Sequence, residues 1–416
     1  MVLYQLYEMQ RTSMQLSSHV LDLQAGALHR LPRPWGKSYG VRTALAASEL
    51  YATLQLTHHR PDFGVQSVMS GGVDVEVREE VVERTAFAAL VRFEKADGSS
   101  DTQPKVLIVP GLAGHFATLV RATIATMLSD HDVYVVDWHN ARDVPVDAGP
   151  FGLDDYVAHL MGFLQTIGSG VHLMAVCQPA VACIAAASLM AEAGDPAEPS
   201  SLILLAGPVD TRVNPSRVSR FAQRQSLSVL KRTMLHTVPA QFPGAGRRVY
   251  PGFLQLGGFM GMDPRRHVTA FRELFRDLRC GNEESAQRTL DFYEEYFAVL
   301  DIDGEFYLDT ARRVFQDNDL PRGQFTWRGE DVDPARLTSA LFTIEGALDE
   351  MCTPGQTEAA HALCTGIPEG RRRHLLQEGV GHYGVFAGST FRQEIYPQIR
   401  DFVARAPLRE PVSSAG

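Results

Sequence analysis

Cys177 is the residue of this chain best placed to do covalent chemistry. It stands where the apolar run VHLMAV ends and the helical run PAVACIAAASLMA begins. A strand that turns sharply into a helix exposes the side chain at the corner, and the helix dipole and free N–H groups stabilise a thiolate there. Small residues suit the positions two before and two after such a corner, which Ala175 and Pro179 occupy. We therefore predict that Cys177 is a nucleophile, whereas Cys183 is expected to be an inert, buried thiol.

A cysteine nucleophile needs a base, and the base needs a group that orients it. Where the nucleophile stands on a strand-to-helix corner, the acid and then the base follow it along the chain, after late strands. Asp349 follows the strand-like run 339–346, and His382 lies in a glycine-rich loop after the next run. We predict a Cys177–Asp349–His382 triad, with Asp210 as the alternative acid.

The same corner predicts the donors that would hold an oxyanion. The backbone N–H of Gln178 follows the nucleophile directly, and the N–H of Leu112, in the loop PGLAGH, is the expected second donor. His115 and His139 lie near strand ends, and we expect both to be structural or to line the pocket. No metal-ligand spacing and no glycine-rich phosphate loop in a usable context is found, so we predict neither a metal nor a dissociable cofactor.

The elements that must position these residues alternate strand and helix. Apolar runs typical of strands buried on both faces begin at Lys105, and they resume after a long helical interval. The runs are 106–110, 132–138, 171–176, 201–207, 339–346 and 372–379. Residues 67–95 alternate apolar and polar residues, which favours antiparallel strands. This pattern predicts an α/β-hydrolase fold, a mostly parallel, doubly wound sheet.

The pattern also predicts how the chain is divided. We expect an N-terminal helical extension over residues 1–60 and a core built from residues 61–211 and 336–408. A helical lid or cap is predicted over 212–335, and a disordered tail over 409–416.

Composition excludes several function classes. A net charge of −10 argues against nucleic-acid binding, which needs a basic face. The five cysteines are odd in number and form no CxxC pair, so we expect reduced thiols and a reducing compartment. The opening residues lack the pattern of a secretory signal, which favours the cytoplasm. The apolar stretch 171–191 is interrupted by Gln178 and Pro179 and is expected to be a strand and a helix instead of a membrane span.

Several long segments resemble one family. The segments LYQLYEMQR, VPGLAGHFATLVR, DVYVVDWHNARDVP, AVCQPAV, AGPVDTRVNP, VYPGFLQLGGFM, LDEMCTPGQT and GVGHYGVFAG are similar to those of intracellular polyhydroxyalkanoate depolymerases. The resemblance implies an α/β-hydrolase fold, with the nucleophile at Cys177, the acid at Asp349 and the base at His382. It also implies hydrolysis of poly(3-hydroxybutyrate)-type polyester on the surface of cytoplasmic storage granules. The acidic charge predicts no nucleic-acid partner, and a homo-oligomer is left open.

An insoluble polyester must be met by an adaptable apolar surface. The segment 249–262 supplies aromatic residues, methionines and glycines, which suit such contacts. We predict that Tyr250, Phe253, Phe259 and Met260 contact substrate, and packing within the lid is the alternative.

Two other functions fit parts of the sequence. A polyhydroxyalkanoate synthase would use the same triad to transfer acyl groups from a coenzyme A thioester. A granule-coating protein would bind polymer without catalysis, although an intact triad argues against it. The AVCQPAV box and the N-terminal segment favour the depolymerase.

Overall fold

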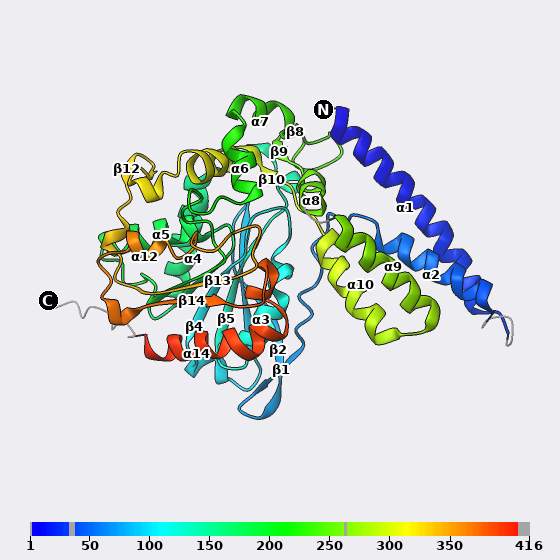
Figure 1. Ribbon diagram of the computed structural model, residues 1–416, viewed down its shortest axis with the longest axis horizontal. Coiled ribbons are helices and arrows are strands. Elements are labelled where there is room, and N and C mark those ends of the chain that lie inside the picture. The colour runs from blue at the N-terminus through cyan, green and yellow to red at the C-terminus, as the bar shows by residue number, and fades with distance from the viewer. Residues whose placement is uncertain (1, 33–37, 262–263, 407–416) are drawn as a thin grey trace.

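A nine-stranded sheet forms the centre of the molecule. The computed structural model describes residues 2–32, 38–261 and 264–406 (Figure 1). The strand order is β1-β2-β3-β5-β4-β6-β7-β13-β14. The strands are β1 (Ser67–Ser70), β2 (Val73–Arg84), β3 (Ala88–Lys95), β4 (Lys105–Val109), β5 (Asp132–Trp138), β6 (His172–Val176), β7 (Ser201–Leu205), β13 (Ala340–Gly346) and β14 (Arg372–Gln377).

The connectivity of this sheet is that of the α/β-hydrolase fold. β3 pairs antiparallel with both β2 and β5, and every pair from β5 to β14 is parallel. Strand β4 lies between β5 and β6, so the chain continues to one side of β4 with β5 and to the other side with β6. The loops after β4 and β6 therefore leave the sheet side by side. Ligands bind at such a switch point, beyond the carboxyl ends of the strands. The fold predicted from the alternating runs is confirmed.

Two layers of helices cover the sheet because its central strands are apolar on both faces. Along β4, Leu107 and Val109 pack into one core cluster, and Val106 and Ile108 pack into the other. Helices α4 (Leu153–Ile167) and α5 (Ala180–Glu192) belong to the first cluster. Helices α3 (Arg121–Met127) and α14 (Tyr396–Arg405) belong to the second.

The segment between β7 and β13 stands over the carboxyl end of the sheet. Its helices are α6 (Arg217–Arg224), α7 (Leu227–Thr233), α8 (Gly252–Met260), α9 (Pro264–Cys280), α10 (Glu283–Phe297) and α11 (Gly304–Asp309). It also holds a small antiparallel sheet of β8 (His236–Thr237), β9 (Arg248–Tyr250) and β10 (Ile302–Asp303), and the hairpin β11 (Thr326–Trp327) and β12 (Glu330–Asp331). These short strands were not expected from the sequence, because two or three residues carry no readable period.

Two helices precede the sheet, as the first 60 residues predict. Helix α1 (Val2–His29) extends along the edge of the molecule, and α2 (Tyr39–Thr53) runs beside it (Figure 1). Helix α2 begins at Tyr39 because the Ser38 side chain accepts from the N–H of Val41 and caps it. The expected disordered tail, 409–416, lies outside the described residues. Among the residues that are described, no helix is long and apolar enough to cross a bilayer.

Candidate active site

Cys177 occupies a strained corner between β6 and α5. Its φ of 67° lies in the left-handed region, which residues with a side chain rarely adopt. The N–H of Cys177 donates to the carbonyl of Leu205 at 2.8 Å, so the corner is fixed to the end of β7. Strain of this kind persists only where the surrounding structure enforces it, and it presents the sulfur at the end of the sheet.

Gly207 allows the corner to sit this close to β7. A Cβ at Gly207 would lie 2.3 Å from the Cβ of Ala180 and 3.0 Å from the carbonyl oxygen of Cys177. Any side chain there would push the first turn of α5 away from the sheet. The segment AGP at 206–208 therefore helps to position the nucleophile.

His382 and Asp349 meet in the arrangement expected of a base and its orienting acid. The Nδ1 of His382 lies 2.7 Å from Asp349 Oδ2, and both side chains are buried. Asp349 Oδ1 accepts from the N–H groups of Met351 at 2.8 Å and Cys352 at 2.9 Å, which fixes the carboxylate. Cys177 and His382 line the same two cavities. The structure thus brings together the three residues of the predicted triad.

The charge environment of His382 suits a base. Burial lowers its pKa, but the nearby Cys177 sulfur and Asp349 carboxylate raise it well above the usual value. An imidazole held this way accepts a proton from sulfur and keeps it while a carbonyl is attacked.

The two expected oxyanion donors also lie together. A Cβ at Gly111 would lie 3.7 Å from the backbone nitrogen of Gln178, so the loop after β4 is packed against the corner. The N–H of Leu112 donates to the Oε1 of Gln178 at 3.3 Å. The Gln178 side chain therefore occupies one of the two donors in this structure.

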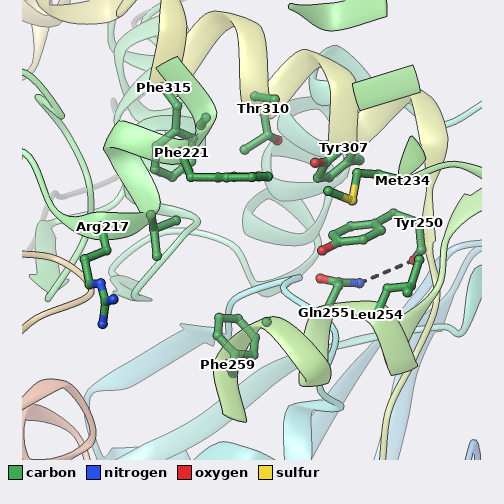
Figure 2. Close-up of a pocket in the computed structure, with 14 residues that line it drawn as sticks. Arg217, Phe221, Met234, Tyr250, Leu254, Gln255, Phe259, Tyr307, Thr310 and Phe315 are labelled. Atoms are coloured by element: carbon green, nitrogen blue, oxygen red, sulfur yellow. Dashed lines mark hydrogen bonds between the residues drawn. The ribbon is translucent and has the colours of Figure 1, made fainter. Parts of the chain in front are cut away.

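An apolar cavity opens beside the nucleophile. A space of about 170 Å³ is bordered by Cys177 and His382 on one side and by Tyr250 and Phe259 on the other. It adjoins a larger cavity of about 510 Å³, whose lining is uncharged apart from Arg217. Figure 2 shows this cavity, lined by Arg217, Phe221, Met234, Tyr250, Leu254, Gln255, Phe259, Tyr307, Thr310 and Phe315.

A more polar cavity, of about 340 Å³, also borders His382. Arg266, His267 and Glu350 border it, together with Tyr296. Phe259 borders all of the cavities around the triad, and its ring stacks on His115 with centroids 5.8 Å apart. His382 therefore borders both an apolar and a more polar cavity, and Phe259 lines both of them.

The four residues predicted to contact substrate take two different places. Tyr250 and Phe259 line the cavities. Phe253 does not appear in their lining, because its ring stacks on Tyr7 at 4.0 Å. Met260 packs with the aromatic cluster of α9 and α10. The contact of Met260 corresponds to the alternative of packing within the lid, whereas Phe253 packs against α1 of the N-terminal extension.

Other residues singled out in the sequence have structural contacts. His115 is buried beside the carbonyl of Tyr296, at 3.2 Å, and burial lowers its pKa to about 4. The Nδ1 of His139 lies 3.0 Å from the carbonyl of Ala86. Asp210, the alternative acid, pairs with Arg212 at 2.7 Å. Burial raises the pKa of the Cys183 thiol, as an inert core cysteine requires.

Several lining residues were missed in the sequence. Tyr307, Thr310 and Phe315 come from α11 and the irregular helical turns that follow it, and Gln255 comes from α8. Gln255 lies in the segment 249–262, where the aromatic residues and Met260 were chosen instead of it. Tyr307, Thr310 and Phe315 belong to no segment singled out in the sequence, and the high aromatic content of 212–335 does not distinguish residues that line a cavity from residues of the core.

One group among the described residues could supply three metal ligands, namely Glu345, Glu358 and His374. Glu345 already accepts backbone N–H groups from Gly355 at 2.8 Å, Thr357 at 2.6 Å and Glu358 at 3.1 Å. This carboxylate holds the loop that follows Asp349, and its bonds explain its burial without an ion.

The chain is similar in sequence to proteins named for polyhydroxyalkanoates. Residues 206–407 match a family described as "PHB de-polymerase C-terminus". The chain is 24% identical over 293 residues to the poly(3-hydroxyalkanoate) polymerase subunit PhaC of Haloferax mediterranei, covering 68% of this chain but only 54% of that protein. It is 25% identical over 320 residues to the PhaC subunit of Allochromatium vinosum, covering 74% and 83%.

Solved structures of similar shape are enzymes of distant sequence. A monoacylglycerol lipase of Paleococcus ferrophilus has 13% identity and a TM-score of 0.42, covering 73% of this chain and 96% of that one. A 2-hydroxy-6-oxo-6-phenylhexa-2,4-dienoate hydrolase of Rhodococcus has 12% identity and a TM-score of 0.41, covering 79% and 99%. The strand order and connectivity described above establish the fold.

Proposed function

We propose that the chain hydrolyses ester bonds of poly(3-hydroxyalkanoate), of the poly(3-hydroxybutyrate) type, through an acyl-thioester at Cys177. The observation that carries the proposal is a Cys177–His382–Asp349 set that opens on an apolar cavity. The sequence segments of depolymerase type and the family matched over residues 206–407 support the polymer as substrate.

The reaction is written from the groups at the corner. His382 takes the proton of the Cys177 thiol, and the sulfur attacks the ester carbonyl. The N–H groups of Gln178 and Leu112 would hold the oxyanion. As the tetrahedral intermediate collapses, the C–O bond breaks and His382 protonates the departing hydroxyl end. Water then gives a proton to His382 and attacks the thioester, which releases a carboxylic acid and restores the thiol.

The two cavities that border His382 suit the two halves of this reaction. The apolar cavity lined by Tyr250, Tyr307 and Phe315 fits the aliphatic acyl chain of a polyester. The more polar cavity bordered by Glu350 and Arg266 also reaches His382 and can hold water. The proposed working place is the surface of a cytoplasmic polyester granule.

A second function is polymer synthesis, and the curated relatives favour it over hydrolysis. Both are named polymerase subunits. A synthase would form the same acyl-thioester at Cys177 from a hydroxyacyl-coenzyme A. The acceptor would then be the hydroxyl end of a growing chain instead of water. Both reactions use the same triad and acyl cavity, so they differ in acyl donor and acceptor.

One experiment separates the candidates. Purified protein is incubated with amorphous poly(3-hydroxybutyrate) and, separately, with 3-hydroxybutyryl-coenzyme A. Acid release from polymer supports hydrolysis, and polymer formation from the thioester supports synthesis. Whichever of the two activities the wild type shows, the Cys177→Ala variant should lack it. Mass spectrometry of the quenched enzyme should show a hydroxyacyl adduct on the peptide containing Cys177.

The outcomes also bear on non-catalytic binding. A protein that adsorbs to polymer, gives neither product and carries no adduct would be a granule-coating protein, and the catalytic proposal would be wrong. Activity that survives in Cys177→Ala would exclude the cysteine as nucleophile.

A further inference from the structure

The outer face of α1 carries a regular line of exposed apolar residues. Positions 6, 9, 13, 16, 20, 23 and 27 follow one another at alternating steps of three and four. They are occupied by Leu6, Met9, Ser13, Leu16, Val20, Leu23 and Ala27, which we call the outer seam. The five large apolar side chains range from 53% exposed at Val20 to 71% at Met9. This is the a/d period of a coiled coil over three heptads.

The opposite face of the same helix is already in use. Tyr4 is fully buried and donates to Asp301, and the Tyr7 hydroxyl lies 2.8 Å from His58 Nε2. Farther along, Leu21 is partly buried, and its carbonyl accepts from Ser48 of α2 at 3.3 Å. The inner face therefore fixes α1 to the molecule, and within this chain the described residues leave the outer seam open to solvent (Figure 1).

The width of the outer seam indicates what covers it. A helix that lies on a broad apolar surface needs a wide apolar face, whereas a strict a/d line is the narrow seam that another helix fills. Polar residues stand directly beside this line, namely Gln5, Gln10, Thr12, Ser17, His19 and Gln24. The seam thus has the shape of a helix-pairing surface.

The charges of the residues beside the outer seam indicate which helix pairs with it. None of the positions directly beside the apolar line is Lys, Arg, Asp or Glu. On one side these positions hold Gln5, Thr12 and His19, and on the other side they hold Gln10, Ser17 and Gln24. A two-fold axis brings identical surfaces together, so like charges in such a pair would repel. A neutral flank avoids this repulsion. Binding to an anionic surface would instead require basic residues beside the apolar line.

We propose that the outer seam of α1 is a homodimer interface, in which the α1 helices of two copies of this chain pair side by side. The span from Leu6 to Ala27 is 22 residues, about 33 Å of helix at 1.5 Å per residue, which is enough for three heptads of knobs-into-holes packing. Because the inner face is anchored at Tyr4, pairing requires no rearrangement of the core.

The association state tests the interface. Sedimentation equilibrium of the full chain should give a dimer, and the double variant Leu16→Glu/Leu23→Glu should weaken dimerisation at least 100-fold. Val73→Glu is the matched control, because Val73 is also exposed but lies at the start of β2, away from α1. Circular dichroism melting should show that all three proteins are folded. A dimer unchanged by the two glutamates, or a wild type that is monomeric throughout, would overturn the proposal.

Cross-linking gives an independent readout. Leu16 lies near the middle of the seam, so two copies bring it close to its equivalent whether the helices run parallel or antiparallel. Leu16→Cys in a Cys280→Ser background should form an intermolecular disulfide under mild oxidation, and the background alone should not. If the double glutamate variant instead loses adsorption to a polyester film while the wild type is a monomer, the seam serves the polymer surface and the dimer is excluded.

Discussion

The backbone N–H of Leu112 donates to the Oε1 of Gln178, so the enzyme's own side chain occupies an expected oxyanion donor. Substrate must displace this amide before both N–H groups can act. A neutral hydrogen bond contributes about 0.5–1.5 kcal/mol net. We therefore predict that Gln178→Ala raises kcat/KM by about 2–10-fold, measured on a soluble ester of 3-hydroxybutyrate.

The opposite result has a clear meaning. Removal of a true oxyanion donor lowers kcat by about 10²–10³-fold. A loss of that size in Gln178→Ala, with normal folding, would show that the side-chain amide is itself a donor to the oxyanion.

Asp349 should be the acid of the triad, and Asp210 should not. Asp349→Asn removes the charge that orients and stabilises His382, so we expect kcat to fall by about 10³–10⁴-fold. Asp210→Asn is the matched control, because Asp210 is also buried after a strand of the sheet but pairs with Arg212. Its kcat should stay near that of the wild type. Equal losses in the two variants would contradict the assignment.

Phe259 and Phe253 lie on the same helix but should respond differently to truncation. Phe259 lines the acyl cavity, so Phe259→Ala should raise KM for hydroxybutyrate oligomers by about 10-fold through lost apolar contact. Phe253 stacks on Tyr7 instead, so Phe253→Ala should lower the free energy of unfolding by about 2–4 kcal/mol with little change in KM. Urea unfolding and oligomer kinetics on both variants check the contrast.

His172 should make the protein sensitive to acid. It is buried at the start of β6, and burial lowers its pKa to about 4. Its Nδ1 lies 2.8 Å from Ser201 Oγ, and this neutral hydroxyl would not compensate a positive charge on the imidazole. Between pH 6.5 and 4 the unfolded chain binds a proton at this site and the folded chain does not. Stability that is complete above pH 6.5 is therefore lost as the pH falls.

The measurement compares wild type with His172→Gln. Between pH 6.5 and 4, the wild-type free energy of unfolding should fall, relative to the variant, by about 1.4 kcal/mol for each pH unit. A difference that does not vary with pH would mean that the imidazole is protonated in the folded protein.

The sequence was sufficient to predict that Cys177, Asp349 and His382 lie together, because each of them follows a strand that can be read on its own. Cys177, Asp349 and His382 stand at the ends of apolar runs, and a parallel sheet brings such ends to one edge. The residues around Phe253 in the sequence do not indicate that it contacts Tyr4 and Tyr7, because those partners lie far away in the sequence, near the N-terminus. Tyr250, three residues earlier, faces the cavity instead.

The same limit applies to the cavity walls. Tyr307 and Phe315 are aromatic residues in helical segments, like the core residues around them, and only the tertiary arrangement separates the two roles. Gln178 was expected to act through its N–H alone. The contact of its side chain with Leu112 depends on how closely the loop after β4 approaches the corner, which no spacing in the sequence records.

In the proposed function, the reacting groups and the chamber that receives the acyl chain come from different stretches of the chain. The triad is held by loops of the sheet, whereas Phe221, Met234, Tyr307 and Phe315 belong to the segment between β7 and β13. Monomer preference can therefore drift through substitutions in that segment while the bond-breaking machinery stays fixed. Exchanging it between homologues is accordingly a route to catalysts for polyesters with longer pendant groups.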